Sequence, residues 1–279
     1  MRKICLGLLL LVLSMTVLGQ RLNVATYNIR CENRSDDAKG NGWKTRCPQV
    51  VKLIRTYDFD LFGAQEVVSN QLKDLLKNLP DYAYVGVARD DGKEKGEFSP
   101  IFYQKSKFVL LKSGTFWLSS NDSVPNVGWD AALPRICTWG KFQQKGGTNF
   151  WYFNLHMDHM GTVARLESAK LVIRKIRKMC GAENVILTGD FNMDQTSEGY
   201  QLIAETLIDT YHKALDRNAT KPTFNDYNLQ AQGDSRIDHI FVTGRFEVIR
   251  YDILTDTYQA DTKRLPSDHY SVRAILQLK

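Results

Sequence analysis

Residues 184–192 read Asn-Val-Ile-Leu-Thr-Gly-Asp-Phe-Asn, an apolar stretch that ends in polar side chains. The aliphatic and β-branched residues of Asn184–Thr188 predict a short buried strand. Asp190 and Asn192 follow this strand directly. Because a rigid strand end presents its side chains to a solvent-accessible cleft, this stretch predicts a functional site at one edge of a β-sheet.

Polar side chains stand at the ends of several other predicted strands. A single polar strand end is uninformative, because Asn and Asp are common turn residues. Six of them together carry carboxylates, carboxamides and imidazoles, which a hard divalent cation and a phosphate ester require together. They are Tyr27-Asn28, Gln65-Glu66, His156-Met157-Asp158-His159, Asp190-Phe191-Asn192, Asp238-His239 and Ser267-Asp268-His269.

The order of predicted elements mixes strands and helices, with no linker or internal repeat. The clearest helix spans 163–180, where apolar residues recur at three- and four-residue steps. The polar stretch 216–235 is predicted to be a loop. This mixture predicts two packed sheets with outer helices in one domain. Strands are predicted at 22–29, 61–65, 82–88, 100–103, 109–118, 135–143, 149–155, 184–188, 237–242, 246–254 and 270–276, and further helices at 48–57, 70–79 and 198–205.

The first nineteen residues have the pattern of a secretory signal. The positive start Met1-Arg2-Lys3 precedes a nearly unbroken apolar run from Ile4 to Leu18, and small residues precede a cleavage position before Gln20. The run of about 15 residues is shorter than the roughly 20 that span a bilayer, although an uncleaved anchor is an alternative. We expect 1–19 to be a signal peptide and 20–279 to be a single exported catalytic domain, periplasmic or extracellular and without stable membrane insertion.

The net charge does not identify a partner. The formal net charge is +6 over 279 residues, and it falls to +4 once Arg2 and Lys3 are removed with the signal. The basic residues are dispersed, and the densest group lies on the predicted helix 163–180, where it forms a solvated face. A nucleic-acid partner is therefore compatible with the charge but not indicated by it.

An exported chain raises the question of disulfides. The mature sequence has four cysteines, an even number that allows three full pairings. We favour a bridge between Cys31 and Cys47, because both flank one loop. Four free thiols, most of them buried, are the alternative. The other two cysteines are Cys137 and Cys180.

The ordered motifs resemble those of the endonuclease/exonuclease/phosphatase superfamily. The resemblance covers essentially the whole mature chain and implies the deoxyribonuclease-I-like fold, a four-layer α/β (α+β) sandwich of two packed mixed β-sheets flanked by helices. Residues 129–135 and 222–224 are similar to the bacterial exported branch, while Leu155 stands where many relatives have a threonine. The motifs are Asn28 in Ala-Thr-Tyr-Asn-Ile-Arg, Glu66 in Ala-Gln-Glu-Val, Asp190 and Asn192 in Gly-Asp-Phe-Asn, Asp238 in Arg-Ile-Asp-His, and Asp268-His269 in Ser-Asp-His.

Members of this superfamily hydrolyse phosphodiesters or phosphomonoesters, and residue types suggest how. Glu66 is the best candidate magnesium ligand, with Asn28 orienting it or assisting through water, and Asp268 within reach of the metal. Mg²⁺ suits such a sparse set of oxygen ligands, and Mn²⁺ would also be accepted.

The remaining residues of the set are assigned to the hydrolytic step. Asp190 is expected to orient or deprotonate the attacking water, and Asn192 to donate to a phosphoryl oxygen. His269 would contact the phosphate as an imidazolium if Asp238 raises its pKa. His156 supplies a second phosphate contact. The sequence does not decide whether Asp190 or His269 takes the proton. A structural role is as well supported as a role in the site for three further residues, Asp158, His159 and His239. Arg135 could bind the substrate phosphate or form a structural ion pair.

The sequence therefore predicts an exported Mg²⁺-dependent phosphoesterase that acts by in-line attack of an activated water. Its substrate is a phosphorylated compound of unknown class, and the protein is expected to be a monomer. Alternatives are a nuclease, a sphingomyelinase-like lipid phosphodiesterase and a non-catalytic binding module on the same fold. A lipid-active enzyme should expose an apolar hairpin, for which Phe116-Trp117-Leu118 is a weak candidate.

Overall fold

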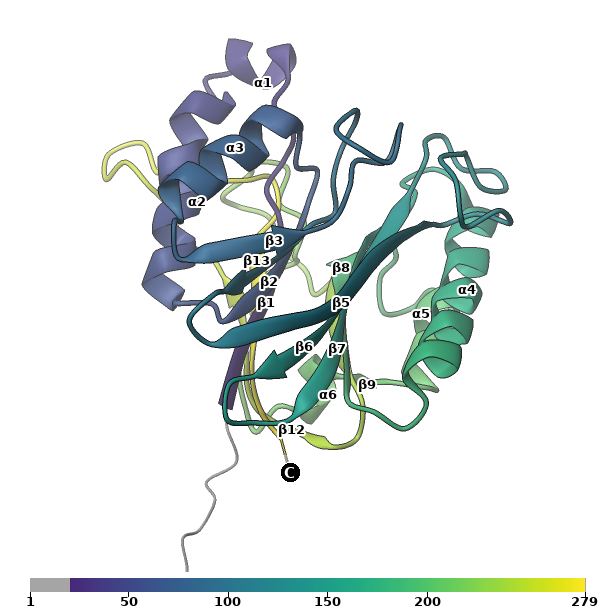
Figure 1. The fold of residues 1–279 in the computed structure, drawn as a ribbon. Coiled ribbons are helices and arrows are strands. Elements are labelled where there is room, and N and C mark those ends of the chain that lie inside the picture. Colours follow the sequence, from purple (N-terminus) through teal and green to yellow (C-terminus); the bar gives the residue numbers. More distant parts are fainter. Residues whose placement is uncertain (1–20, 279) are drawn as a thin grey trace, which may run out of the picture.

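The computed structural model describes residues 21–278, so the predicted signal peptide lies outside the described residues. Two mixed β-sheets pack face to face, and helices cover the outer side of each sheet, which gives four layers (Figure 1). The predicted α/β sandwich is thus confirmed. Within 21–278, no helix is both long and apolar enough to cross a membrane.

The first sheet has seven strands, with β1 (Arg21–Asn28) near its centre. β1 pairs in parallel with β2 (Leu61–Gln65) and antiparallel with β13 (Ser271–Leu278). Helices α2 (Trp43–Tyr57) and α3 (Ser69–Asn78) cover its outer face (Figure 1). The other elements of this half are α1 (Arg34–Ala38), β3 (Tyr82–Val85), β4 (Ile101–Gln104), β10 (Asp216–Asn218) and β12 (Phe246–Leu254).

The second sheet has six strands, with β8 (Val185–Asp190) in its interior. β8 pairs in parallel with β7 (Asn149–His156) and antiparallel with β11 (Asp238–Val242). Helices α4 (Thr162–Cys180) and α5 (Glu198–Ala204) cover its outer face. The other elements of this half are β5 (Phe108–Trp117), β6 (Ile136–Gln144), β9 (Ile208–Asp209) and α6 (Thr210–Lys213).

Three apolar cores separate the four layers. The inner core lies between the sheets and includes Val24 and Leu61 of the first sheet with Tyr152 and Ile186 of the second. An outer core lies under each pair of helices. Phe116-Trp117-Leu118 is buried, so this segment is not an exposed apolar hairpin.

The side chains of β7 alternate between the faces of the second sheet, as in any strand. Asn154 faces the first sheet, and its Nδ2 donates to the carbonyl oxygens of Ala64 at 2.8 Å and Pro100 at 3.0 Å. Leu155 packs in the outer core with the residues of α4. The leucine that departs from the family pattern therefore faces a helix, away from the site.

Gly63 of β2 allows this close approach of the two sheets. The face of β2 at Gly63 lies against the side chain of Asn154. A Cβ on Gly63 would come within 2.6 Å of the Thr188 hydroxyl oxygen. The amide of Gly63 also donates to the hydroxyl of Tyr152 at 3.2 Å. Polar contacts between the sheets are thus concentrated where a glycine leaves room for them.

The strand directions bring the predicted polar residues to one edge of the sandwich. β1 and β2 end there because they are parallel, and β7 and β8 end there for the same reason. β11 and β13 begin at this edge because each is antiparallel to its neighbour. Asp238 is consequently paired with Asp190, and His156 flanks Asp190 on the other side.

Some predicted elements differ from the observed ones. Helix α2 begins at Trp43 rather than at Pro48, because Trp43 and Cys47 extend its buried apolar face toward the N-terminus. The stretch 216–235 is not wholly a loop, since β10 pairs with β12. The unpredicted α1, β9, β10 and α6 have at most 5 residues each, too few to show a periodicity.

The expected disulfide is wrong, because the cysteines at 31, 47, 137 and 180 are all free. Cys47 packs in the core beneath α2, whereas Cys31 lines a cavity at the edge of the sandwich. The two cysteines flank one loop, which suggested a disulfide across it, but α2 directs the side chain of Cys47 into the core.

Candidate active site

A cavity of about 430 Å³ opens at the edge where the strand ends meet. Six of the eight predicted site residues line it, and the other two, Asn28 and Asp238, are fully buried and hydrogen-bonded to them. The structure therefore brings the whole predicted set together. The six lining residues are Glu66, His156, Asp190, Asn192, Asp268 and His269.

Asp190 lies at the centre of this set, at the end of β8. Its Oδ2 accepts a hydrogen bond from Asn28 Nδ2 at 3.0 Å, and its Oδ1 accepts one from the backbone amide of Asn192 at 2.9 Å. Asn192 adopts a left-handed conformation with φ of 48°, which turns its backbone amide toward the carboxylate. Burial, together with the neighbouring charge of Asp238, raises the pKa of Asp190 to about 7.

His269 and Asp238 form a buried ion pair beside Asp190. His269 Nδ1 donates to Asp238 Oδ2 at 2.9 Å, while its Nε2 lies 3.8 Å from Asp190 Oδ2. Burial alone would lower the pKa of His269, but the carboxylates of Asp238 and Asp190 outweigh it and raise the pKa to about 10. His269 is therefore an imidazolium at neutral pH.

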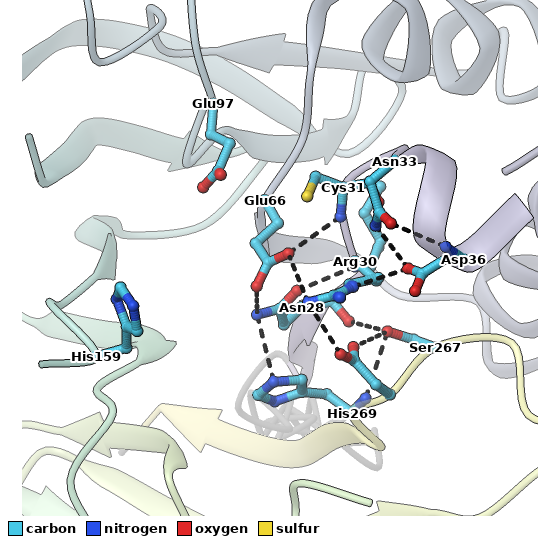
Figure 2. Close-up of polar contacts among 12 residues, drawn as sticks. Asn28, Arg30, Cys31, Asn33, Asp36, Glu66, Glu97, His159, Ser267 and His269 are labelled. Atoms are coloured by element: carbon cyan, nitrogen blue, oxygen red, sulfur yellow. Dashed lines mark hydrogen bonds and ion pairs between the residues drawn. The ribbon is translucent and has the colours of Figure 1, made fainter. Parts of the chain in front are cut away.

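Glu66 is held on the other side of Asn28, as Figure 2 shows. Asn28 Nδ2 donates to Glu66 Oε1 at 3.0 Å, and the amide of Cys31 donates to Glu66 Oε2 at 3.1 Å. Burial acts to raise the pKa of Glu66, but these donors and the nearby positive charges lower it. Asn28 Oδ1 accepts from the amide of Arg30 at 3.0 Å, so the Asn28 side chain orients both Glu66 and Asp190 through its nitrogen.

Glu66 and Asp268 form a pair of carboxylates that share one cationic neighbour. Arg30 Nη1 lies 3.9 Å from Glu66 Oε2 and 3.4 Å from Asp268 Oδ2. Both carboxylates line the cavity. Hard, anionic oxygen donors in this arrangement fit Mg²⁺ or Mn²⁺.

A second group of ligand-type atoms is the set Asp190, Asp238 and His269, which lie within 4.8 Å of one another. His269 Nδ1 and Asp238 Oδ2 are already hydrogen-bonded to each other at 2.9 Å, so a cation held by this set would have to break that contact. We therefore assign the better cation site to the Glu66 and Asp268 side of the cavity.

His156 has the opposite charge state from His269. Its Nε2 lies 3.0 Å from Arg135 Nη1 and 3.2 Å from Asn192 Nδ2, and both of these nitrogens are donors. Burial and the positive charges of Arg135 and Arg89 lower the pKa of His156 well below its ordinary value. The neutral ring accepts at Nε2, so the structure directs its Nδ1 proton away from Asp190.

Asp158 and Arg135 organise the loops around the cavity. Arg135 Nε donates to Asp158 Oδ2 at 3.2 Å, and Arg135 Nη2 lies 2.9 Å from His159 Nδ1. Asp158 Oδ1 accepts from the backbone amides of Ala132, Met160 and Gly161. Asp158 is thus a structural anchor, whereas Arg135 and the half-exposed His159 also line the cavity.

His239 does not belong to the cavity. Its Nε2 lies 3.0 Å from the carbonyl oxygen of Met193, and its ring packs against Phe191, Tyr200 and Phe241. The Asp-His dipeptide therefore sends its two side chains to opposite faces of β11, as strand alternation requires.

Sequence reasoning missed several residues of the cavity wall. Glu97 comes from the loop between β3 and β4, within a run of charged residues that shows no motif. Phe224 and Asp226 come from the stretch predicted as a loop, where Phe224 lies edge-on to His269. The Asn-Ile-Arg motif contains Arg30 and was the available signal for it. The cavity wall also includes Cys31, Leu133 and Ile237.

Fold and site together define a class of protein. A four-layer sandwich with carboxylates, an amide and an imidazolium at one sheet edge is the architecture of phosphoesterase hydrolases. Residues 25–269 match the model of the Endonuclease/Exonuclease/phosphatase family. The chain belongs to this family.

Two solved bacterial structures and one viral protein resemble this chain over most of its length. An endonuclease/exonuclease/phosphatase family protein from Bacteroides thetaiotaomicron is 47% identical with a TM-score of 0.91, covering 94% of this chain and 99% of that one. A mannosyl-6-phosphatase of the same organism is 48% identical with a TM-score of 0.89, covering 91% and 99%. An uncharacterized protein of Acanthamoeba polyphaga mimivirus is 27% identical over 257 residues, 84% of this chain and 92% of the viral protein.

Proposed function

We propose that this protein is a divalent-metal-dependent phosphatase that hydrolyses the phosphomonoester of a phosphorylated sugar. The observation that carries the proposal is the arrangement of Asp190, whose carboxylate is fixed by Asn28 and Asn192 next to the His269–Asp238 pair. This arrangement lies at the wall of a cavity large enough for one sugar phosphate.

In the proposed reaction, Asp190 accepts a hydrogen bond from the attacking water and takes its proton. The imidazolium of His269 donates from Nε2 to one phosphoryl oxygen. Asn192 Nδ2, which contacts His156 Nε2 and the carbonyl of Met157 in this structure, turns the first of these N–H groups to a second phosphoryl oxygen as the phosphorus passes through its trigonal bipyramidal geometry. Asp238 keeps His269 charged and correctly oriented. The bond between phosphorus and the sugar oxygen breaks, and the sugar leaves as an alcohol after its oxygen takes a proton from a solvent water. The proton held by Asp190 passes to solvent, which returns the carboxylate to its starting state.

The proposed cation site is formed by Glu66 and Asp268. A bound Mg²⁺ would neutralise phosphoryl charge and stabilise the leaving oxygen. The carboxylate of Glu66 is already oriented by Asn28 and by the amide of Cys31, so little rearrangement is needed to receive a cation.

A sugar phosphate is supported by the comparison and by the size of the cavity. The relative that is 48% identical is a mannosyl-6-phosphatase. A cavity of about 430 Å³ suits one pyranose with its phosphate. A nuclease, by contrast, is expected to have a basic groove that follows the nucleic-acid backbone, whereas the basic residues of this chain are dispersed along the sequence.

Export remains part of the proposal. The apolar run at 4–18 and the small residues before Gln20 support cleavage of a signal peptide and action outside the cytoplasm. Fractionation of cells that express the full chain, with N-terminal sequencing of the product, tests this. Full-length protein in the cytoplasm would contradict it.

The catalytic proposal is tested with Asp190→Ala and His269→Ala against Glu198→Gln, an exposed-helix control. With Mg²⁺ and mannose 6-phosphate, each site variant should lose about 100-fold to 10,000-fold in kcat, whereas the control keeps its activity. Circular dichroism melting checks that all three variants are folded. Full activity of both site variants would refute the assignment, and cleavage of bis(p-nitrophenyl) phosphate without monoester cleavage would point to a diesterase.

A further inference from the structure

Glu97 is a carboxylate of the cavity wall that the proposed hydrolysis does not use. It lies on the loop between β3 and β4, across the open space from Glu66 and His269 (Figure 2). Its side chain is 18% exposed, and that exposure is toward the cavity. Glu97 is therefore available to a molecule bound there.

The side chain of Glu97 is fixed before any substrate arrives. Arg89 Nη1 donates to Glu97 Oε2 at 2.6 Å, and Arg89 Nη2 donates to Glu97 Oε1 at 3.0 Å. The loop itself is held by the amide of Phe98, which donates to the carbonyl of Val67, and by the indole of Trp117, which donates to the carbonyl of Arg89. A bidentate pair on an anchored loop positions a carboxylate with little entropic cost on binding.

In its ion pair with Arg89, Glu97 accepts hydrogen bonds on both oxygens and donates none. An ionised carboxylate has about four lone-pair positions, and Arg89 occupies one on each oxygen. The remaining positions suit hydroxyl donors. They disfavour a second phosphate or carboxylate, which would bring more lone pairs and negative charge to the same place.

The location of Glu97 matches the size of a sugar. The imidazole of His156 lies between Asp190 and Glu97, with its Nε2 3.6 Å from Asp190 Oδ2 and its Nδ1 3.8 Å from Glu97 Oε2. The imidazole ring of His156 thus separates Glu97 from Asp190, the carboxylate proposed to activate water. In a sugar phosphate, the hydroxyl groups on the sugar ring lie at a comparable separation from the phosphorus.

We propose that Glu97 is a specificity-determining residue that binds hydroxyl groups of the alcohol part of the substrate. The inference rests on the proposed phosphatase function and narrows its substrates to phosphorylated sugars whose alcohol part is neutral. Two other residues of the wall agree, since Phe224 is exposed and offers apolar contact to C–H groups and Asp226 is a further acceptor, whereas Arg30 and Arg135 are the cations of the same wall. A substrate whose alcohol part places a second anionic group at Glu97 is disfavoured.

The test compares Glu97→Gln with Glu94→Gln, an exposed glutamate on the same loop that does not line the cavity. Three substrates are measured with Mg²⁺: mannose 6-phosphate, fructose 1,6-bisphosphate and p-nitrophenyl phosphate, which has no hydroxyl groups. In Glu97→Gln, kcat/KM for mannose 6-phosphate should fall about tenfold or more, mainly through KM. The value for p-nitrophenyl phosphate should be unchanged, and that for the bisphosphate should rise. Glu94→Gln should match the wild type on all three.

The outcomes separate the two proposals. An equal loss on mannose 6-phosphate and p-nitrophenyl phosphate would mean that Glu97 acts through His156, and it would overturn the inference while leaving the phosphatase intact. Unchanged values for all three substrates would also overturn it. A wild-type protein that cleaves neither monoester refutes the proposed function, and the inference falls with it. Glu97→Ala, with melting curves, repeats the comparison without the amide that Gln introduces.

Discussion

His156 and His269 lie in one cavity and have opposite charge states. His269 faces Asp238 and Asp190, which raise its pKa, whereas His156 faces Arg135, which lowers its pKa. The wall near Asp238 therefore supplies a positive hydrogen-bond donor, and the wall near Arg135 supplies a neutral ring. Phosphoryl oxygens bind best near the first of these.

At the residue scale, Asp158 makes stability depend on pH. Burial acts to raise its pKa, but the amides of Gly161, Ala132 and Met160, together with Arg135, lower it from 3.8 to about 2. Because the folded pKa is depressed, ionised Asp158 stabilises the fold fully above pH 4, and this contribution is lost as the pH falls toward 2.

We predict that Asp158→Asn lowers the free energy of unfolding by about 1–3 kcal/mol at pH 7, since it weakens the set of hydrogen bonds to a charged acceptor. The difference from wild type should shrink steadily between pH 4 and pH 2.5. Urea denaturation at several pH values measures it. A difference that stays constant over this range would contradict the role of the charge.

The positions of the candidate site residues and the positive charge of His269 were largely predictable, whereas the neutral state of His156 was not. Asn28, Glu66 and Asp190 follow strands with clear apolar patterns, so their place at a sheet edge follows from strand geometry. The neutral state of His156 depends on its burial and on the charges of Arg135, which precedes β6, and of Arg89, which lies in a loop. Sequence order does not reveal such neighbours.

At the element scale, three successive residues of β7 contact three different parts of the molecule. Asn154 ties it to the first sheet, Leu155 packs under α4, and His156 faces the cavity. The loop between β3 and β4, by contrast, was not predictable as part of the site. Backbone hydrogen bonds within the loop shape it, but its position depends on contacts with Val67 and Trp117, which come from remote parts of the chain.

We predict that Gly63→Ala lowers the free energy of unfolding by about 1–3 kcal/mol, because the added methyl group overpacks the space next to Asn154 and Thr188. Gly244→Ala is the matched control, since a Cβ there would meet only Ile208 at 3.8 Å. Chemical denaturation of both variants measures the difference. If the two variants had the same free energy of unfolding, the sheets would be able to move apart slightly without loss of stability.

At the scale of the whole molecule, the two-sheet sandwich followed from the mixture of strands and helices, and its long elements were predictable. The start of α2 was not, because burial of Trp43 in the tertiary core extends the helix beyond Pro48. The free state of Cys31 and Cys47 also depends on tertiary packing, which sequence spacing does not convey.

We predict that Mg²⁺ stabilises the whole fold. Because a cation at Glu66 and Asp268 binds only the folded chain, Mg²⁺ at about 100 times its dissociation constant should add about 2.7 kcal/mol, and EDTA should remove this gain along with activity. Differential scanning calorimetry measures the shift in Tm. The shift should be lost in Glu66→Gln and kept in Glu198→Gln. The same shift in both variants would place the cation elsewhere.

The position of β13 has a consequence for biosynthesis. β13 inserts between β1 and β12, and it is translated after both of its neighbours. The nascent chain therefore cannot close its first sheet or form the His269–Asp238 pair until residue 269 and the strand after it have left the ribosome. A polypeptide that is still being made therefore has no assembled candidate site, however much of its second sheet has already folded.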